Sequence, residues 1–215
     1  MARKPLDIVH PKVARYLESL VPPRDRVLAE MEARANAEDI PIVGPLVGRL
    51  FFQLALMTRA KRVMELGSAI GYSTMWWARG VGSDGEVWYT DASAENARDA
   101  IGYLERGGVA DRVHFMVGDA VQCMAEVKGK FDIVFCDIDK PGYPAALRAA
   151  MPRLKRGGLL VVDNTLWKGW VASRWGGGAS TKAVKRLNAL TYGDDDSAFT
   201  VLIPLRDGVS VVVKR

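Results

Sequence analysis

The chain has 215 residues, of which 49% are apolar and 26% charged, and its formal net charge is +5 from 30 basic and 25 acidic residues. This is the composition of an ordinary globular protein with enough chain for one substantial hydrophobic core, and it excludes the disordered, fibrous and low-complexity classes. The basic excess is modest and no lysine or arginine run exceeds three residues, so an ordinary solvated surface is favoured over a nucleic-acid-binding one.

The cellular compartment follows from three absences in the sequence. The two cysteines, Cys123 and Cys136, form neither a disulfide framework nor a metal-ligand spacing. The stretch Met1–Pro5 lacks the apolar core of a signal peptide. No segment approaches the roughly 20 apolar residues that span a bilayer. We therefore predict a cytoplasmic protein without membrane contact.

Residues 11–60 have a helical pattern and are predicted to pack on the core or to extend it. Pro22-Pro23 is expected to open a helix that Ile40-Pro41 ends. A third segment, Val43–Met57, is largely apolar and is expected to be buried against the sheet or against another subunit. The apolar positions of the helix between the two proline sites are Val27, Met31 and Ala35.

From residue 62 onward, short apolar runs alternate with helical patterns, which predicts a doubly wound, mostly parallel sheet of the Rossmann type in an α/β fold. The helices are expected at about residues 72–79, 93–106, 119–127 and 143–154. Asp207-Gly208 between the β-rich runs 199–204 and 209–213 predicts a closing antiparallel hairpin. The parallel strands are expected at Val63–Leu66, Val87–Thr90, Val113–Val117, Ile133–Phe135 and Leu159–Val162.

The first strand turns into the first helix of this pattern through a glycine-containing loop. Gly67 and Gly71 allow the backbone to approach a ligand closely. Their spacing is Gly-x-x-x-Gly, which differs from the Gly-x-Gly-x-x-Gly that cradles a dinucleotide pyrophosphate. Glu65 precedes them inside the strand. The loop therefore favours a positively charged or hydroxylated ligand over a phosphate.

Acidic residues also end the second and third strands. Asp91, 20 residues beyond Gly71, can accept both hydroxyls of a ribose. After the third strand, Asp119 is placed to accept from the exocyclic amine of an adenine, next to Ala120. Taken singly, these aspartates can equally be helix N-caps and the glycines plain turns. Their ordered placement at three successive strand ends favours a cofactor site.

The fourth and fifth strands end in a second polar set. Asp137 and Lys140 follow the fourth strand, and Asp163-Asn164 follows the fifth. Carboxylate and amide oxygens at the carboxyl edge of a parallel sheet suit a hard divalent cation. Lys140 would supply a proton acceptor beside that cation. The alternatives are a turn-and-cap pair for Asp163-Asn164 and a surface position for Lys140.

These residues carry a resemblance to a known family. The chain resembles the cation-dependent, S-adenosylmethionine-dependent O-methyltransferases, which include the catechol and caffeoyl-coenzyme A methyltransferases, over roughly residues 40–215. The Asp-x-x-Lys and Asp-Asn-x-Leu-Trp-x-Gly motifs are its most specific parts. The matching segments are Val63–Gly67 with Gly71–Ser73, Phe131–Lys140, Gly157–Gly169 and Ile203–Gly208.

The resemblance implies one class I methyltransferase domain over residues 1–215 and a role for each matching site residue. Lys140 would be the general base, and Asp137, Asp163 and Asn164 would bind the cation, expected to be Mg²⁺ with Ca²⁺ or Mn²⁺ as alternatives. A homodimer is also implied. S-adenosylmethionine would be held by Val43, Glu65, Gly67, Ser68, Ser73, Asp91 and Ala120, with Asp137 at its amino group.

The acceptor stays open at this point. The main prediction is a small aromatic with vicinal hydroxyls, and the alternatives are a hydroxylated tRNA base, an NAD-dependent oxidoreductase and a binding module without catalysis. Three tryptophans follow Asp163-Asn164. They are expected either to form a wall of the acceptor pocket or to pack in the core and at a subunit contact. They are Trp167, Trp170 and Trp175.

Overall fold

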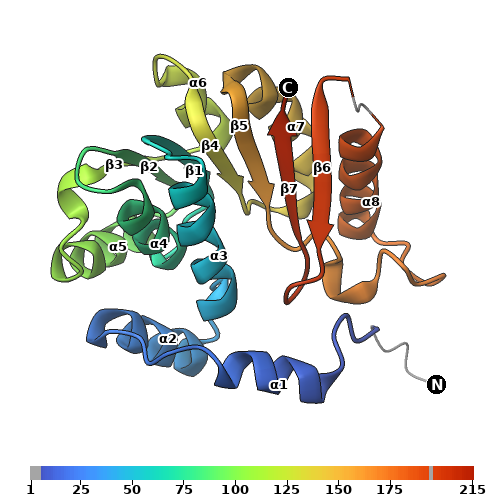
Figure 1. Ribbon diagram of the computed structural model, residues 1–215, viewed down its shortest axis with the longest axis horizontal. Coiled ribbons are helices and arrows are strands. Elements are labelled where there is room, and N and C mark those ends of the chain that lie inside the picture. Colours follow the sequence, from blue (N-terminus) through green and yellow to red (C-terminus); the bar gives the residue numbers. More distant parts are fainter. Residues whose placement is uncertain (1–5, 194–195) are drawn as a thin grey trace.

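The computed structural model describes residues 6–193 and 196–215, so Met1–Pro5, on which the prediction about a signal peptide rests, lies outside the described residues. A seven-stranded sheet runs through the molecule in the order β3-β2-β1-β4-β5-β7-β6 (Figure 1). The first five strands in that order are parallel to one another, and β7 runs antiparallel to both of its neighbours, β5 and β6. The strands are β1 Arg62–Leu66, β2 Glu86–Asp91, β3 Val113–Val117, β4 Phe131–Cys136, β5 Leu154–Val162, β6 Ala198–Ile203 and β7 Val209–Lys214.

The predicted mixed sheet and its closing hairpin are therefore confirmed. The chain order reverses between β1 and β4, which pair in parallel at the centre of the sheet. A ligand crevice forms at such a switch point in open α/β sheets. The helices are α1 Pro11–Ser19, α2 Arg26–Glu38, α3 Gly44–Met57, α4 Tyr72–Val81, α5 Ala94–Arg106, α6 Ala120–Glu126, α7 Tyr143–Arg153 and α8 Ala179–Tyr192, with 3₁₀ turns at Ala110–Arg112, Lys140–Gly142 and Trp167–Gly169.

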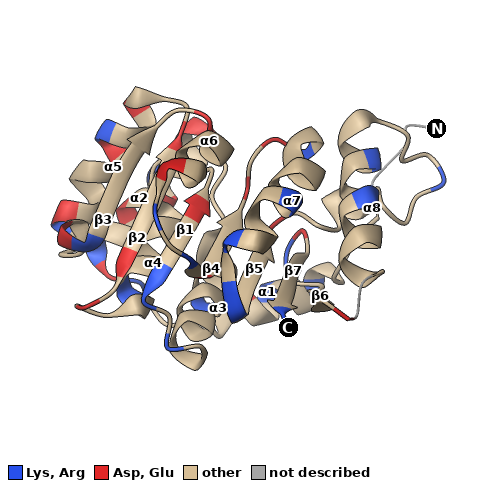
Figure 2. Ribbon diagram, turned by 90° about the horizontal axis from the view of Figure 1, so that it is seen from above, with Lys and Arg blue, Asp and Glu red and all other residues tan. Residues whose placement is uncertain are grey.

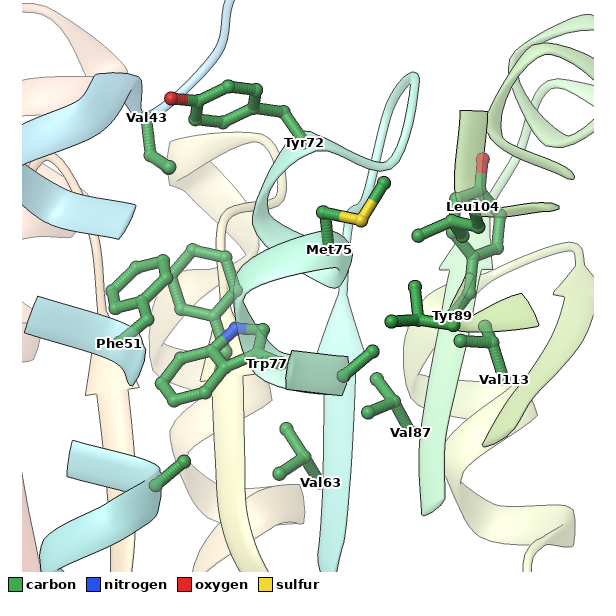
Figure 3. Packing of buried hydrophobic residues seen from close by; sticks show 14 of the residues in the cluster. Val43, Phe51, Val63, Tyr72, Met75, Trp77, Val87, Tyr89, Leu104 and Val113 are labelled. Carbon is green, nitrogen blue, oxygen red and sulfur yellow. The ribbon is translucent and has the colours of Figure 1, made fainter. Parts of the chain in front are cut away.

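Two hydrophobic layers cover the two faces of the sheet, because successive strand residues point to opposite sides. One layer joins α3, α4 and α5 to residues such as Val63 and Val87, and the other joins α6, α7 and α8 to residues such as Met64. In the first layer Phe51 of α3 stacks on Trp77 of α4, with ring centroids 4.3 Å apart (Figure 3). This contact packs α3 tightly onto α4 and so fixes the segment that precedes α3.

The amino-terminal helices differ in detail from the prediction. Pro22-Pro23 does not open the second helix, which begins at Arg26. Asp25 is its N-cap, and the carboxylate accepts hydrogen bonds from the backbone N–H groups of Val27 and Leu28. A capping carboxylate satisfies these free donors, which a proline cannot do. The prolines thus lie in the turn before the helix.

The apolar segment Val43–Met57 belongs largely to the chain's own core. Val47, Phe51 and Ala55 are fully buried beneath α4 and the sheet, while Leu56 and Met57 at the end of α3 are exposed. Of the two locations expected from sequence, the sheet is the observed one. None of the helices in the described part of the chain is long and apolar enough to cross a membrane.

Candidate active site

The loops that follow β1 and β4 approach each other closely at the switch point. Gly67 has φ +86°, and a Cβ on it would lie 2.6 Å from the carbonyl oxygen of Asp137. The backbone N–H of Asp137 donates to the carbonyl of Leu66 at 2.8 Å. Only glycine combines this left-handed conformation with so close a neighbour. The glycine-containing loop after β1 and the backbone of Asp137 are therefore in direct contact.

A cavity of about 670 Å³ opens beside this contact, which is a typical size for a small-molecule site. Six carboxylates line it against two basic side chains, Lys140 and Arg206, so that its charge favours a cationic ligand over a phosphate. In Figure 2, by contrast, both charge signs are spread over the molecule. The carboxylates belong to Glu32, Asp39, Asp91, Asp137, Asp139 and Asp163.

Asp91 holds the far end of this cavity in shape. Its Oδ2 accepts from the backbone N–H of Ala69 at 2.9 Å, and its Oδ1 accepts from the N–H of Ser93 at 2.8 Å and from the side-chain amide of Asn96 at 3.0 Å. The carboxylate thereby joins the loop after β1 to the start of α5. It is fixed in orientation and still lines the cavity.

Glu65 lies behind the cavity and is fully buried. The hydroxyl of Thr74 donates to its Oε2, while its Oε1 has no hydrogen-bond partner among the described side chains and backbone. Burial raises the pKa of Glu65 to about 7, and the nearby hydroxyls of Ser73, Thr74 and Ser68 oppose the shift. Two of those serine and threonine residues, Ser68 and Ser73, line the cavity. Glu65 is thus a buried acid next to two serines of the cavity lining.

Asp137, Asp163 and Asn164 meet at the other end of the cavity. The Nζ of Lys140 lies 2.7 Å from Oδ1 of Asp137. Asp163 is only 3% exposed, and burial together with repulsion from Asp137 raises its pKa to about 7. The hydroxyl of Tyr143 donates to the backbone carbonyl of Asp163 at 2.9 Å. Two close carboxylates in a buried place favour a bound cation.

No group of three His, Cys, Asp or Glu side chains that could hold a metal ion occurs in residues 6–193 and 196–215. The oxygen donors at this end of the cavity are instead the carboxylates of Asp137 and Asp163 and the side-chain amide of Asn164. Such an all-oxygen set fits the chemistry of Mg²⁺ and excludes a thiolate or imidazole site.

A second cavity, of about 560 Å³, meets the first at Asn164 and Arg206, which line both. Its wall is partly apolar, with Leu17 of α1, Leu46 of α3 and Leu205 of the β6–β7 hairpin. Figure 1 shows the carboxyl ends of β4 and β5 and this hairpin directed toward α1. The partly apolar second cavity therefore adjoins the acidic first cavity at Asn164.

Strained backbone conformations gather around the two cavities. Seven non-glycine residues of the described chain have positive φ, and five of them line a cavity, whereas Arg59 lies away from both. Such conformations cost energy and persist where the surrounding structure enforces them, commonly at functional sites. The five are Asp39, Ala69, Asn164, Lys168 and Arg206.

The chain is similar to proteins of a known family. The sequence model of the family described as O-methyltransferase matches residues 26–215. The chain belongs to the O-methyltransferase family. A catechol O-methyltransferase of Mycobacterium tuberculosis is 36% identical over 164 residues, which cover 75% of this chain and 74% of the relative. A catechol O-methyltransferase of Niastella koreensis is 30% identical over 200 residues, covering 89% and 90%.

Solved O-methyltransferase structures have the same fold. The enzyme TomG of Streptomyces achromogenes, solved in complex with SAM, superimposes with a TM-score of 0.83 at 28% identity, covering 94% of this chain and 96% of that one. The expected family and fold class are confirmed, and this chain is an O-methyltransferase rather than an NAD-dependent oxidoreductase.

The structure brings most of the predicted site residues of this O-methyltransferase together in the first cavity. Three lie outside its lining: Glu65 is beneath it, and Asp119 and Ala120 begin α6. Asp119 is exposed and its Oδ1 accepts from the backbone N–H of Gln122 at 2.9 Å. It is therefore observed as the helix N-cap that the sequence left as an alternative. The nine that line the cavity are Val43, Gly67, Ser68, Ser73, Asp91, Asp137, Lys140, Asp163 and Asn164.

Other lining residues were missed from sequence. Glu32 and Asn36 reach the cavity from α2, where their spacing of four on one helix face was a usable signal. Tyr72, next to Gly71, donates its hydroxyl to Glu32 at 2.7 Å. Arg206 joins from the hairpin. The tryptophans that follow Asp163-Asn164 do not line either cavity, and Trp167 packs against the core instead.

Proposed function

We propose that this O-methyltransferase transfers the methyl group of S-adenosylmethionine to one hydroxyl of a small catechol-like aromatic, with the help of a divalent cation. One observation carries the proposal: an acidic cavity that suits a cationic methyl donor meets a partly apolar cavity at Asn164, next to the carboxylate of Asp163. The names of the relatives as catechol O-methyltransferases and the SAM complex of a similar structure support it.

The cofactor would lie along the first cavity, from Asp91 to Asp137. Asp91 is oriented to accept the two ribose hydroxyls. The sulfonium and ammonium charges would face the carboxylates that line the cavity. A bound cation would also favour the ionised form of Glu65, whose pKa is raised to about 7. Gly67 allows the backbone to approach the ligand without a Cβ in the way.

The cation would be held by Asp137, Asp163 and Asn164, since this donor set fits a hard divalent ion and the two acids repel each other without one. A bound divalent ion supplies charge that favours the ionised form of a hydroxyl and can orient two adjacent oxygens. Magnesium suits these ligands best, with calcium or manganese as the alternatives.

Lys140 is the proposed proton acceptor. A phenol has a pKa near 10, so its ionisation at pH 7 costs about 4 kcal/mol, which the site must offset. In this structure Lys140 is ion-paired with Asp137, and its side chain is 11% exposed between the rings of Tyr143 and Trp167. To act as the acceptor, Lys140 must first release the proton of this ion pair to water, as Asp137 directs its charge to the cation. The neutral amine would then take the hydroxyl proton and hold it at Nζ.

The acceptor oxygen then attacks the sulfonium methyl carbon in line: the C–O bond forms as the C–S bond breaks, and the neutral thioether leaves. Charges of opposite sign neutralise in this step, so a site with little water favours it. The carboxylates and the cavity walls contribute mainly by holding the two reacting atoms in line, whereas Lys140 contributes as the proton acceptor.

The test is methyl transfer from labelled S-adenosylmethionine to a panel of catechols, with Mg²⁺ and with EDTA. We expect transfer that EDTA abolishes and that Lys140→Met and Asp163→Asn reduce at least about a hundredfold, the usual scale of a general acid–base group. Lys155→Met is the matched control, because Lys155 forms a similar ion pair with Asp132 at 2.6 Å at the opposite edge of the sheet. Full activity of Lys140→Met, or transfer in EDTA, contradicts the mechanism.

The remaining expectations about partners are tested alongside. Unmodified and hydroxylated tRNA serve as further acceptors at low salt, where a tRNA enzyme would bind tightly. Methylation of tRNA without methylation of any catechol would replace the acceptor proposed above. We also propose a homodimer, and light scattering of the purified protein gives its mass directly.

A further inference from the structure

Arg206 lies in the turn of the β6–β7 hairpin and lines both cavities. Its Nη1 donates to the backbone carbonyl of Ile42 at 2.9 Å, across 164 positions of the chain. The guanidinium also packs against Gly44: a Cβ on that glycine would lie 3.5 Å from Nη1. One side chain thus joins the hairpin to the segment Ile40–Val43, which lines the first cavity just before α3.

This position is unfavourable for an arginine. Arg206 has φ +49°, a conformation that costs energy for any residue with a side chain. The guanidinium sits at the amino-terminal end of α3, where the helix dipole disfavours a positive charge. Both features act against stability, and they are offset by the hydrogen bond to Ile42 and by the attraction between the guanidinium and the carboxylates of Asp163 and Asp207.

The hairpin is also anchored without the side chain. The backbone N–H of Thr165 donates to the carbonyl of Gly208 at 2.9 Å, and that of Leu166 donates to the carbonyl of Asp207 at 2.8 Å. These bonds hold the hairpin turn against the loop that carries Asn164. The contact from Arg206 to Ile42 adds instead a link across the boundary between the two cavities.

We propose that Arg206 is a positioning residue, which ties the segment Ile40–Val43 to the hairpin and so keeps the methyl donor and the acceptor at a fixed separation. The inference rests on the proposed function, because it assigns the two cavities to those two ligands. Among residues 6–193 and 196–215, only Arg206 and Asn164 line both cavities, and Asn164 belongs to the proposed cation site. Arg206 is therefore the residue outside that site best placed to set the geometry between the ligands.

Three substitutions separate this role from a structural one. Arg206→Met removes the hydrogen bond but keeps an unbranched side chain and the backbone strain. Arg206→Lys keeps a donor that can reach Ile42. Arg206→Gly removes both the contact and the strain. Arg59 provides the matched control, because it is an exposed arginine with φ +50° that lines neither cavity, so Arg59→Met and Arg59→Gly report strain and charge alone.

We expect kcat of Arg206→Met with 3,4-dihydroxybenzoate to fall at least about tenfold, since small misplacements of reacting atoms have large effects on rate. The KM for S-adenosylmethionine should change much less, Arg206→Lys should recover part of kcat, and Arg206→Gly should lose kcat while its Tm stays level or rises. Hydrogen exchange at Ile42 and Val43 should speed up in Arg206→Met without any ligand. The Arg59 variants should retain wild-type kcat and exchange.

Several results would overturn the proposal. They are wild-type kcat in Arg206→Met, a loss of kcat that only accompanies a lower Tm, an equal loss in Arg59→Met, and unchanged exchange at Ile42 and Val43. The exchange measurement needs no acceptor, so it decides on the contact even when the wild-type enzyme turns over no catechol. In that case the catechol proposal fails, and the link between hairpin and segment is judged separately.

Discussion

The contact between the loops after β1 and β4 predicts a large effect of adding one methyl group at Gly67. This glycine has φ +86°, and a Cβ would lie 2.6 Å from the carbonyl oxygen of Asp137. The left-handed conformation costs an alanine about 1–2 kcal/mol. Forcing the two loops apart adds about 1–3 kcal/mol. We therefore expect Gly67→Ala to lower the free energy of unfolding by about 2–5 kcal/mol, or the Tm by roughly 4–20 °C for a chain of this size.

Gly157→Ala is the matched control for this prediction. Gly157 has φ +77° but no atom within 4 Å of the Cβ position, so it carries the backbone cost without the clash. Its Tm should fall by roughly 2–8 °C, and its cofactor affinity should be unchanged. Thermal unfolding gives the stability of both variants, and titration calorimetry gives the affinity for S-adenosylmethionine.

The Gly67→Ala substitution should also change ligand binding. Because the displaced carbonyl belongs to Asp137, Gly67→Ala should weaken binding of both the cofactor and the cation, whereas Gly157→Ala should weaken neither. Equal Tm losses in the two variants would refute the close-approach argument. Wild-type cofactor affinity in a folded Gly67→Ala protein would refute the placement of the cofactor against this loop.

Three further predictions concern the core, a buried acid and a buried hydroxyl. Phe51→Ala should cost about 3–5 kcal/mol in urea unfolding, because Phe51 is fully buried in the aromatic stack, whereas Phe199→Ala at a half-exposed site should cost about 0.5 kcal/mol or less; equal losses would contradict the assigned core. The pKa of Glu65 is raised from 4.5 to about 7, so the folded state binds the extra proton and the stability that Glu65 contributes is lost as the pH rises through that window. Glu65→Gln should therefore make stability less dependent on pH between 4.5 and 7, and an unchanged slope in urea titrations would contradict it. Tyr143→Phe should lower stability by about 1–3 kcal/mol, because the carbonyl of Asp163 loses its buried donor; unfolding at the wild-type urea concentration would show that water replaces it.

Much of the site could be predicted because it depends on local pattern and on one rule of topology. Apolar runs with period two identify the strands, and parallel strands direct their carboxyl ends to one edge. Asp91, Asp137 and Asp163 end three such strands, so their convergence in one cavity follows from the alternation of strands and helices alone.

Residues whose role depends on packing could not be assigned in this way. Asp119 follows a strand just as Asp91 does, yet its side chain caps α6 and is not part of the cavity lining. Both uses of an aspartate have the same local sequence pattern, and the difference lies in which neighbouring backbone N–H groups are free. The start of α2 at Arg26 has the same cause, because the carboxylate of Asp25 accepts from the free backbone N–H groups of the first turn.

The sequence by itself determined the α/β class, the positions of the strands, the glycine turn and the acids at the strand ends, because these depend on side-chain period, backbone freedom and charge within a few residues. Tertiary structure alone decided that α2 lines the first cavity, that Phe51 stacks on Trp77, and that Arg206 reaches Ile42. Those contacts join segments far apart in the chain, and they follow from how the helices pack on the two faces of the sheet, which no local pattern specifies.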